Sequence, residues 1–258
     1  MHVSSLYIYP IKSCKGFSVD KVSLDTKGFR YDRRFMLVDE EGQMLTQRIL
    51  PQMALIDVAW QDDFFVINKG ISVPLQPQGG DKTKVQVWSD VCTAWNISAE
   101  ANEYFSDFLK QKVRLVYMPD QTKRVVDTRY NTVKATTTFT DGFPILLISQ
   151  ASLNDLNTRL EKPVEMQRFR PNLVVEGFYP YQEDDISGFS IGEKQFSVVK
   201  PCARCVMTTI NPQTAEKGAE PLKTLSEYRK KNNKIYFGQN VIHHSHEGEI
   251  NVGHKVEI

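Results

Sequence analysis

The sequence has few cysteines and almost no excess charge, and both shortages exclude classes of protein. Its 258 residues contain four cysteines, which are too few for a disulfide framework. The 32 basic and 31 acidic side chains leave a formal net charge of +1, so the chain as a whole has no attraction to nucleic acid or to an anionic membrane. We therefore expect no nucleic-acid partner, and any basic site must be assembled locally by folding.

Long apolar runs and a secretory leader are also lacking. No apolar stretch approaches the roughly 18–20 residues that cross a bilayer. The first ten residues, MHVSSLYIYP, do not combine a charged start with an apolar run and a small-residue cleavage site. The sequence therefore predicts no membrane partner and a cytoplasmic location, where cysteines stay reduced.

Short apolar segments separated by polar turns are abundant in the chain. Phe35–Val38, the turn Asp39-Glu-Glu-Gly42 and a second apolar segment form a pattern typical of a β-hairpin. Two more hairpins with a central glycine are predicted at residues 189–198 and 250–258. Other strands are expected at residues 3–9, 54–60, 64–68, 85–88, 93–97 and 113–118. Trp60, Trp88 and Trp95 fall in these strands and are expected in the core.

Three helices are predicted between the strands. Apolar residues at three-and-four spacing follow Ser98, a plausible N-cap, and further helices are expected at residues 149–160 and 222–231. The polar stretch 119–138 is predicted to be a working loop or a mobile one, and it is a candidate for the rim of a substrate opening. These features predict a mainly β fold with minor α content (α+β), in which a β-barrel-like domain over residues 1–118 packs tightly on a second β-barrel over residues 119–258, with peripheral helices.

Cys202 and Cys205 form a Cys-x-x-Cys pair that has three ordinary explanations. A zinc site would need more ligands, but there is no second cysteine pair, and the histidine cluster at residues 243–246 lies about forty residues further on. A thioredoxin-type dithiol belongs at a helix N-terminus, whereas residues 206–210 look like a strand. The third explanation is that both cysteines are packed as small hydrophobic side chains.

Arg204 shifts the balance toward metal chemistry. It immediately precedes Cys205, and a neighbouring guanidinium favours the thiolate form of a cysteine. The thiolate is the form that binds soft transition metals.

Several short motifs follow one another in a fixed order along the chain. They are LYIYPIKSCKG (6–16), DRRF (32–35), TDGFP (140–144), SQASLNDLN (149–157), FRPN (169–172) and the cysteine segment continuing to EPLKTL (220–225). With these motifs the chain resembles MOSC-domain proteins and, more narrowly, the mitochondrial amidoxime-reducing component and its bacterial relatives, almost from end to end. The resemblance implies a MOSC-associated β domain over residues 1–118 and a MOSC domain over residues 119–258.

The same resemblance assigns roles to individual residues. In that family the cysteine followed by x-x-Thr-Thr binds the molybdenum of a pterin cofactor, which places the metal ligand at Cys205 and leaves Cys202 as a nearby or packed thiol. Asp141 matches an acidic position near the metal, where it would relay a proton, although a turn-capping aspartate is the alternative. The positions that match cofactor-contacting residues are Lys12, Ser13, Arg34, Arg170, Asn172 and Arg204.

The residue types suit that cofactor. Arginine offers a planar fork for the cofactor's phosphate, and an asparagine can both donate and accept at a pterin edge. Arg170 precedes Pro171, which favours an extended backbone at Arg170. For any one of these basic residues alone, a solvated surface position is the alternative.

The resemblance implies a molybdenum-dependent oxidoreductase. It would reduce N-hydroxylated compounds such as amidoximes, hydroxamic acids and hydroxylamino nucleobases. The four cysteines lack the spacing of a [2Fe–2S] domain, so no iron–sulfur cluster is expected in this chain. Electrons are then expected from an external donor, namely a flavoprotein reductase, a flavodoxin or a ferredoxin. The alternatives are a molybdenum-cofactor carrier or sulfur-transfer module without reductase activity, and a metal-free binding module.

Overall fold

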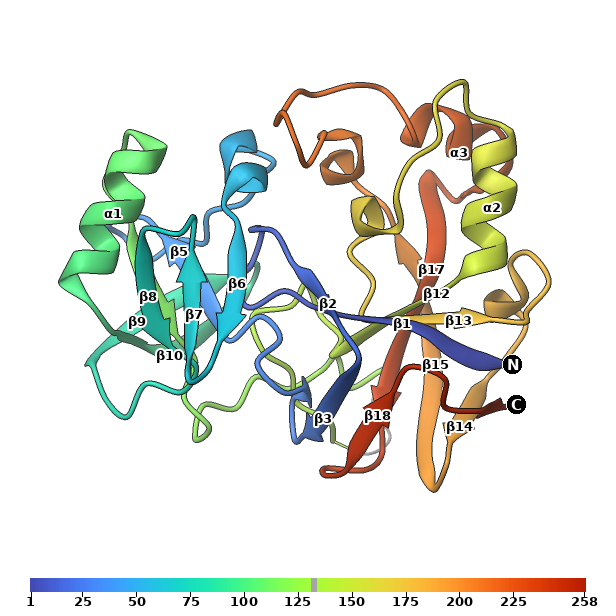
Figure 1. Ribbon diagram of the computed structural model, residues 1–258, viewed down its shortest axis with the longest axis horizontal. Coiled ribbons are helices and arrows are strands. Elements are labelled where there is room, and N and C mark those ends of the chain that lie inside the picture. Colours follow the sequence, from blue (N-terminus) through green and yellow to red (C-terminus); the bar gives the residue numbers. More distant parts are fainter. Residues whose placement is uncertain (131–133) are drawn as a thin grey trace.

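Strands are the most abundant regular secondary structure in the molecule, and the helices lie at its periphery. The computed structural model describes residues 1–130 and 134–258. In that part of the chain, α1 lies at one end of the molecule, α2 and α3 lie at the other, and the sheets fill the space between (Figure 1). The predicted mainly β fold with minor α content is confirmed.

The largest sheet has nine strands, most of them from the C-terminal half of the chain. β12 and β13 pair in parallel, and the other pairs are antiparallel. Backbone bonds join Val3 to Gly253 and His254, so the first strand also meets the stretch before the last one, which gives a barrel-like arrangement. The order is β19 (Val256–Glu257), β14 (Gly188–Ile191), β15 (Lys194–Ala203), β17 (Lys234–His243), β12 (Ile145–Ser149), β13 (Leu173–Glu176), β1 (His2–Ile8) and β2 (Phe17–Val19), with β16 (Lys230–Lys231) beside β17.

Three smaller sheets complete the β structure. Alternation of apolar and polar residues places one face of these strands in the core, as in β8, where Ile71 and Val73 are buried and their neighbours are exposed. One sheet has the order β5 (Phe35–Val38), β11 (Arg114–Tyr117), β10 (Asp90–Asn96) and β9 (Asp81–Val87). The others are β6 (Val58–Gln61), β7 (Phe64–Ile67) and β8 (Ile71–Pro74), and β18 (Glu249–Asn251), β3 (Lys21–Asp25) and β4 (Gly28–Phe29).

Strands from the two ends of the chain pair with each other. β1 pairs with β13, with His2 opposite Glu176, and β3 pairs with β18. The division into residues 1–118 and 119–258 stays a prediction, but these hydrogen bonds tie the first thirty residues directly to the C-terminal half.

The three predicted helices are present. α1 (Ala99–Leu109) begins at Ser98, whose hydroxyl accepts the backbone N–H of Ala101 at 3.1 Å, and α2 (Gln150–Thr158) is capped in the same way by Ser149. α3 (Leu222–Tyr228) is shorter than predicted because residues 230–231 leave the helix and form β16.

Some local predictions are wrong. Residues 206–209 form a 3₁₀ helix, η4 (Val206–Thr209), because the backbone N–H and the hydroxyl of Thr208 both donate to the carbonyl of Cys205 and so replace a strand ladder. Residues 250–258 do not form a hairpin, since β18 pairs with β3 and β19 pairs with β14.

Two further expectations concern exposed parts of the chain. Trp60 and Trp88 are 43% and 39% exposed, so they are not core residues. The predicted loop at 119–138 contains no helix or strand within residues 119–130 and 134–138, and residues 131–133 lie outside the described part.

Gly238 provides a test of how β17 is seated beside β12. Its φ is +79°, and a Cβ there would lie 2.6 Å from Cγ1 of Ile148 and 2.8 Å from the carbonyl oxygen of Leu147. We expect Gly238→Ala to lower the free energy of unfolding by about 2–3 kcal/mol, measured by urea denaturation. Gly79→Ala is the matched control, since nothing lies within 4 Å of its Cβ. Equal stability of the two variants would contradict this packing.

Candidate functional site

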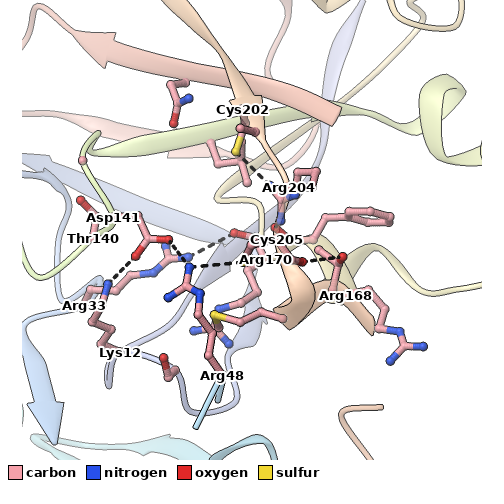
Figure 2. Close-up of a pocket in the computed structure, with 18 residues that line it drawn as sticks. Lys12, Arg33, Arg48, Thr140, Asp141, Arg168, Arg170, Cys202, Arg204 and Cys205 are labelled. Carbon is pink, nitrogen blue, oxygen red and sulfur yellow. Dashed lines mark hydrogen bonds and ion pairs between the residues drawn. The ribbon is translucent and has the colours of Figure 1, made fainter. Parts of the chain in front are cut away.

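A cavity of about 140 Å³ brings together residues that are far apart in the sequence (Figure 2). Its walls carry six basic side chains and one carboxylate, although the chain as a whole is nearly neutral. The predicted local assembly of a basic site is therefore found in the structure. The charged residues and cysteines that line the cavity are Lys12, Arg33, Arg48, Asp141, Arg168, Arg170, Cys202, Arg204 and Cys205.

Cys205 is placed by the end of β15 and the turn that follows it. The backbone N–H of Arg204 donates to the carbonyl of Ile235 on β17 at 2.7 Å, which extends the strand pairing to the residue before the cysteine. The Thr208 hydroxyl then donates to the Cys205 carbonyl at 3.0 Å. The strand and the 3₁₀ turn together fix the position of the Cys205 backbone at the cavity wall.

The two thiols of the Cys-x-x-Cys pair contact different arginines. Arg204 donates to Sγ of Cys202 at 3.0 Å and to the carbonyl of Phe169 at 2.6 Å, whereas Sγ of Cys205 accepts from Arg48 at 3.2 Å. Alternate residues of an extended segment share a face, so Arg204 lies with Cys202 and not with its immediate neighbour. The guanidinium beside Cys205 thus comes from a distant segment.

Arg33 and Arg170 lie on the ring of Tyr9. Their guanidinium carbons are 4.2 and 4.3 Å from the ring centroid, in cation–π contact with the buried tyrosine. Burial and the nearby charge of Arg33 lower the pKa of Arg170 to about 10. Such a site favours a ligand that brings negative charge.

Arg170 does not have the extended backbone that Pro171 predicts. Its φ is +55°, and its N–H donates to the carbonyl of Gln167, which closes the 3₁₀ helix η2 (Met166–Phe169). This left-handed turn leaves the Arg170 side chain to donate to the Cys14 carbonyl at 2.6 Å.

Lys12 and Asp141 form an ion pair at the cavity. Nζ of Lys12 is 2.6 Å from Oδ1 of Asp141 and 2.8 Å from the carbonyl of Phe139. Burial lowers the pKa of the Lys12 ammonium, and the attraction of Asp141 opposes that shift. Desolvation raises the pKa of the Asp141 carboxyl, but Lys12, then Arg48 and a hydrogen bond from Trp88, hold that pKa well below its usual range.

Most of the predicted site residues line the cavity, but two do not. Lys12, Ser13, Asp141, Arg170, Arg204 and Cys205 are at its wall. Arg34 is buried elsewhere and donates to the carbonyl of Met118 at 2.7 Å and to the carboxylate of Asp120. Asn172 accepts from Arg33 at 3.0 Å and donates to the carbonyl of Tyr7, so it supports a wall residue from behind.

Three cavity arginines were missed from the sequence: Arg33, Arg48 and Arg168. Arg33 stands directly before Arg34 in the DRRF motif, so the motif indicated the right segment but the neighbouring residue. The sequence around Arg48 and Arg168 carries no comparable signal.

Several buried donors at the cavity have no partner among the described residues. They are Nη1 of Arg48, Nη1 of Arg168 and Nε of Arg204, and the hydroxyl of Tyr9 is in the same state in an adjoining crevice. A buried donor without an acceptor costs about 1–3 kcal/mol, so the cavity suits a ligand rich in acceptors and negative charge.

Comparison with known proteins gives the class and then the family. Residues 1–112 match the MOSC N-terminal beta barrel domain, and residues 134–257 match the MOSC domain. Together with the cationic, cysteine-bearing cavity, these matches define a MOSC protein with a molybdenum-cofactor-related function. The relatives described next place it more narrowly.

Mitochondrial amidoxime-reducing component 1 of Mus musculus is 36% identical over 242 residues, which cover 88% of this chain and 71% of the mouse protein. Mitochondrial amidoxime reducing component 2 of Bos taurus is 34% identical, with 88% and 72% covered. The molybdenum cofactor sulfurase of Oryza sativa is 32% identical over 92% of this chain but only 32% of the rice protein. The chain belongs to the family of the mitochondrial amidoxime-reducing components.

These relatives also correct the expected location. The prediction of a cytoplasmic protein is wrong, because the family members are named as mitochondrial proteins and so point to mitochondria. In the described residues, the structure contains no helix with the length and apolar character needed to span a membrane.

The Lys12–Asp141 pair gives a test of the cavity electrostatics. Replacing Asp141 by Asn removes the charge and the acceptor that raise the pKa of Lys12, so burial acts unopposed and this pKa should fall further. NMR titration of isotope-labelled lysine side chains would measure the change. Asp120→Asn, which alters the partner of Arg34, should leave the Lys12 pKa unchanged. An unchanged Lys12 pKa in Asp141→Asn would show that the pair does not form.

Proposed function

We propose that this protein is a molybdenum-cofactor-dependent oxidoreductase that reduces N-hydroxylated compounds, with Cys205 as the protein's sulfur ligand to the metal. The observation that carries the proposal is the cavity itself, whose lining combines Cys205 with six basic residues, several of which have buried donors without partners among the described residues. Amidoximes, hydroxamic acids and hydroxylamino nucleobases are the proposed substrates, and the names of the relatives support the first of these.

The residues present fit a pterin cofactor with a phosphate. Arg170, Arg33 and Lys12 supply positive charge, and Ser13 adds a hydroxyl at the same wall. In this proposal they hold the phosphate, while the free donors of Arg168 and Arg204 face acceptors of the fused ring. Arg34 and Asn172 were expected to contact the cofactor. In this proposal their contribution is indirect, since both lie behind the cavity wall.

In the proposed reaction Cys205 holds the metal, and Asp141 takes part in the delivery of protons. When bound, the cofactor supplies the two-electron redox chemistry that turns an N–OH group into N–H with release of water. Asp141 is held ionised by Lys12 and Arg48, so in proton delivery it acts as a hydrogen-bond acceptor that orients a proton donor, such as the Lys12 ammonium, and does not carry the proton itself. Electrons come from a separate donor protein, such as a flavoprotein reductase, a flavodoxin or a ferredoxin.

A second candidate keeps the cofactor without the reduction. The similarity to the rice molybdenum cofactor sulfurase supports a cofactor carrier or sulfur-transfer module. The coverage of 71–72% of the amidoxime-reducing components, against 32% of the rice protein, favours the reductase.

The ligand assignment predicts a sharp difference between the two cysteines. In protein from a host that makes the molybdenum cofactor, Cys205→Ser should lose the metal because it removes the proposed ligand. Cys202→Ser should keep it. Elemental analysis of the folded variants gives the metal-to-protein ratio, and a normal ratio in Cys205→Ser would rule out this ligand.

An activity assay distinguishes the proposed reductase from the alternative, a cofactor carrier. With reduced viologen as electron source, the metal-loaded protein should convert an amidoxime to the amidine, measured by chromatography. Product no greater than that of cofactor-free protein, from a sample shown to hold molybdenum, would favour the carrier.

The cofactor cradle can be tested with neighbouring arginines. Arg33→Ala and Arg170→Ala each remove a cavity-wall guanidinium and should lower molybdenum occupancy several-fold. Arg34→Ala is the matched control, since this adjacent arginine points elsewhere, and any loss there should follow the loss of folded protein seen by circular dichroism. Occupancy that falls only in folded Arg34→Ala would place the cradle elsewhere.

A further inference from the structure

Arg48 reaches the metal-binding cysteine from the other half of the chain. It lies just before η1 (Pro51–Leu55), and its backbone carbonyl accepts from Lys217 at 3.4 Å. Its side chain extends into the cavity and donates from Nη2 to Sγ of Cys205 at 3.2 Å (Figure 2). The contact joins two residues that are 157 positions apart in the sequence.

The guanidinium of Arg48 is held by groups other than the sulfur. Its central carbon lies 4.5 Å from the ring centroid of Trp88, and Nη2 is 3.7 Å from Oδ2 of Asp141. Trp88 in turn donates from its indole to Oδ1 of Asp141 at 3.3 Å. Stacking on one side and a carboxylate on another fix the guanidinium, so its position does not depend on the thiol alone.

The position of the Trp88 side chain depends on the left-handed backbone conformation of this residue. It follows β9 at the turn into β10, and its φ is +57°, a left-handed conformation that is uncommon for a bulky residue. Strain of this kind persists where the surroundings fix the conformation, and it is found mostly at functional sites. Here it turns an indole ring toward Arg48 and Asp141 instead of into the core.

We propose that Arg48 is a positioning residue whose hydrogen bond to the Cys205 sulfur raises the reduction potential of the metal that this sulfur binds. The proposal rests on the proposed function. Donors to a ligating sulfur are among the features that set the potential of a protein-bound metal. A donor with a full positive charge stabilises the more electron-rich, reduced state most, so the reduced metal is favoured.

The geometry singles out Arg48 among the cavity cations. Arg204 donates to the other thiol, and Lys12 is engaged with Asp141. Among the hydrogen bonds and ion pairs of the described residues, no second cation contacts Sγ of Cys205.

The test measures the potential of the bound metal in molybdenum-loaded protein. Redox titration followed by the electron paramagnetic resonance signal of Mo(V) should give a more negative midpoint potential in Arg48→Ala than in the wild type. Arg48→Lys, which keeps the charge but loses the fork, should give a smaller shift in the same direction. Molybdenum occupancy should stay near that of the wild type in both variants.

Arg124→Ala is the matched control, because it removes a buried guanidinium beside the cavity, where it donates to the carbonyls of Thr138 and Thr140, without contacting Cys205. Its midpoint potential should match the wild type. A shift as large as that of Arg48→Ala would mean that cavity charge in general sets the potential, and an unchanged potential in Arg48→Ala would overturn the inference directly.

Two further results would also test the proposed role of Arg48. If both Arg48 variants fold but hold no molybdenum, Arg48 is a cofactor-binding residue and the proposed tuning role is wrong. If the wild type itself holds no molybdenum, the proposed function fails first, and this outcome is distinct from a loaded protein whose potential does not respond to Arg48.

Discussion

Crowding of positive charge around one small cavity is the constraint on which the site depends. Six basic side chains and a single carboxylate line it, and like charges that close together repel. The fold tolerates them because backbone carbonyls accept from several of the cations, including those of Cys14, Phe139, Phe169 and Arg170. Those carbonyls belong to bends and to the end of the 3₁₀ helix η2, so the irregular backbone near the cavity supplies the acceptors that its positive charge needs.

The carboxylates near the cavity neutralise only part of its positive charge, and the excess determines which kind of ligand the cavity suits. Asp32 is buried against Arg33, and Asp141 is shared by Lys12 and Arg48, but the cations outnumber these carboxylates. Buried cations with too few hydrogen-bond acceptors favour the binding of an anionic ligand. A cofactor with a phosphate and an acceptor-rich ring is such a ligand, which is why the proposed cofactor and the observed cavity suit each other.

The sequence predicted the features that depend on local pattern and missed those that depend on long-range contact. Apolar spacing identified α1, α2 and most strands, and Ser98 caps α1 as expected, whereas the cap at Ser149 was not predicted. Arg33 was confused with Arg34 because adjacent residues point in opposite directions, and only the folded chain shows which one faces the cavity. Arg48 could not be found, because nothing near it signals that it will meet a cysteine 157 residues later.

The pairing of the first strand with a late one has a consequence for how the protein is made. On the ribosome, His2 emerges long before Glu176, its partner across the β1–β13 ladder, and the chain must keep β1 unpaired on that side while some 170 residues are added. An unpaired strand edge can meet another chain, so a slow translation step between the two strands exposes the nascent protein to aggregation. The strand that ties the ends of the chain together is therefore also one whose pairing must wait until most of the chain has been made.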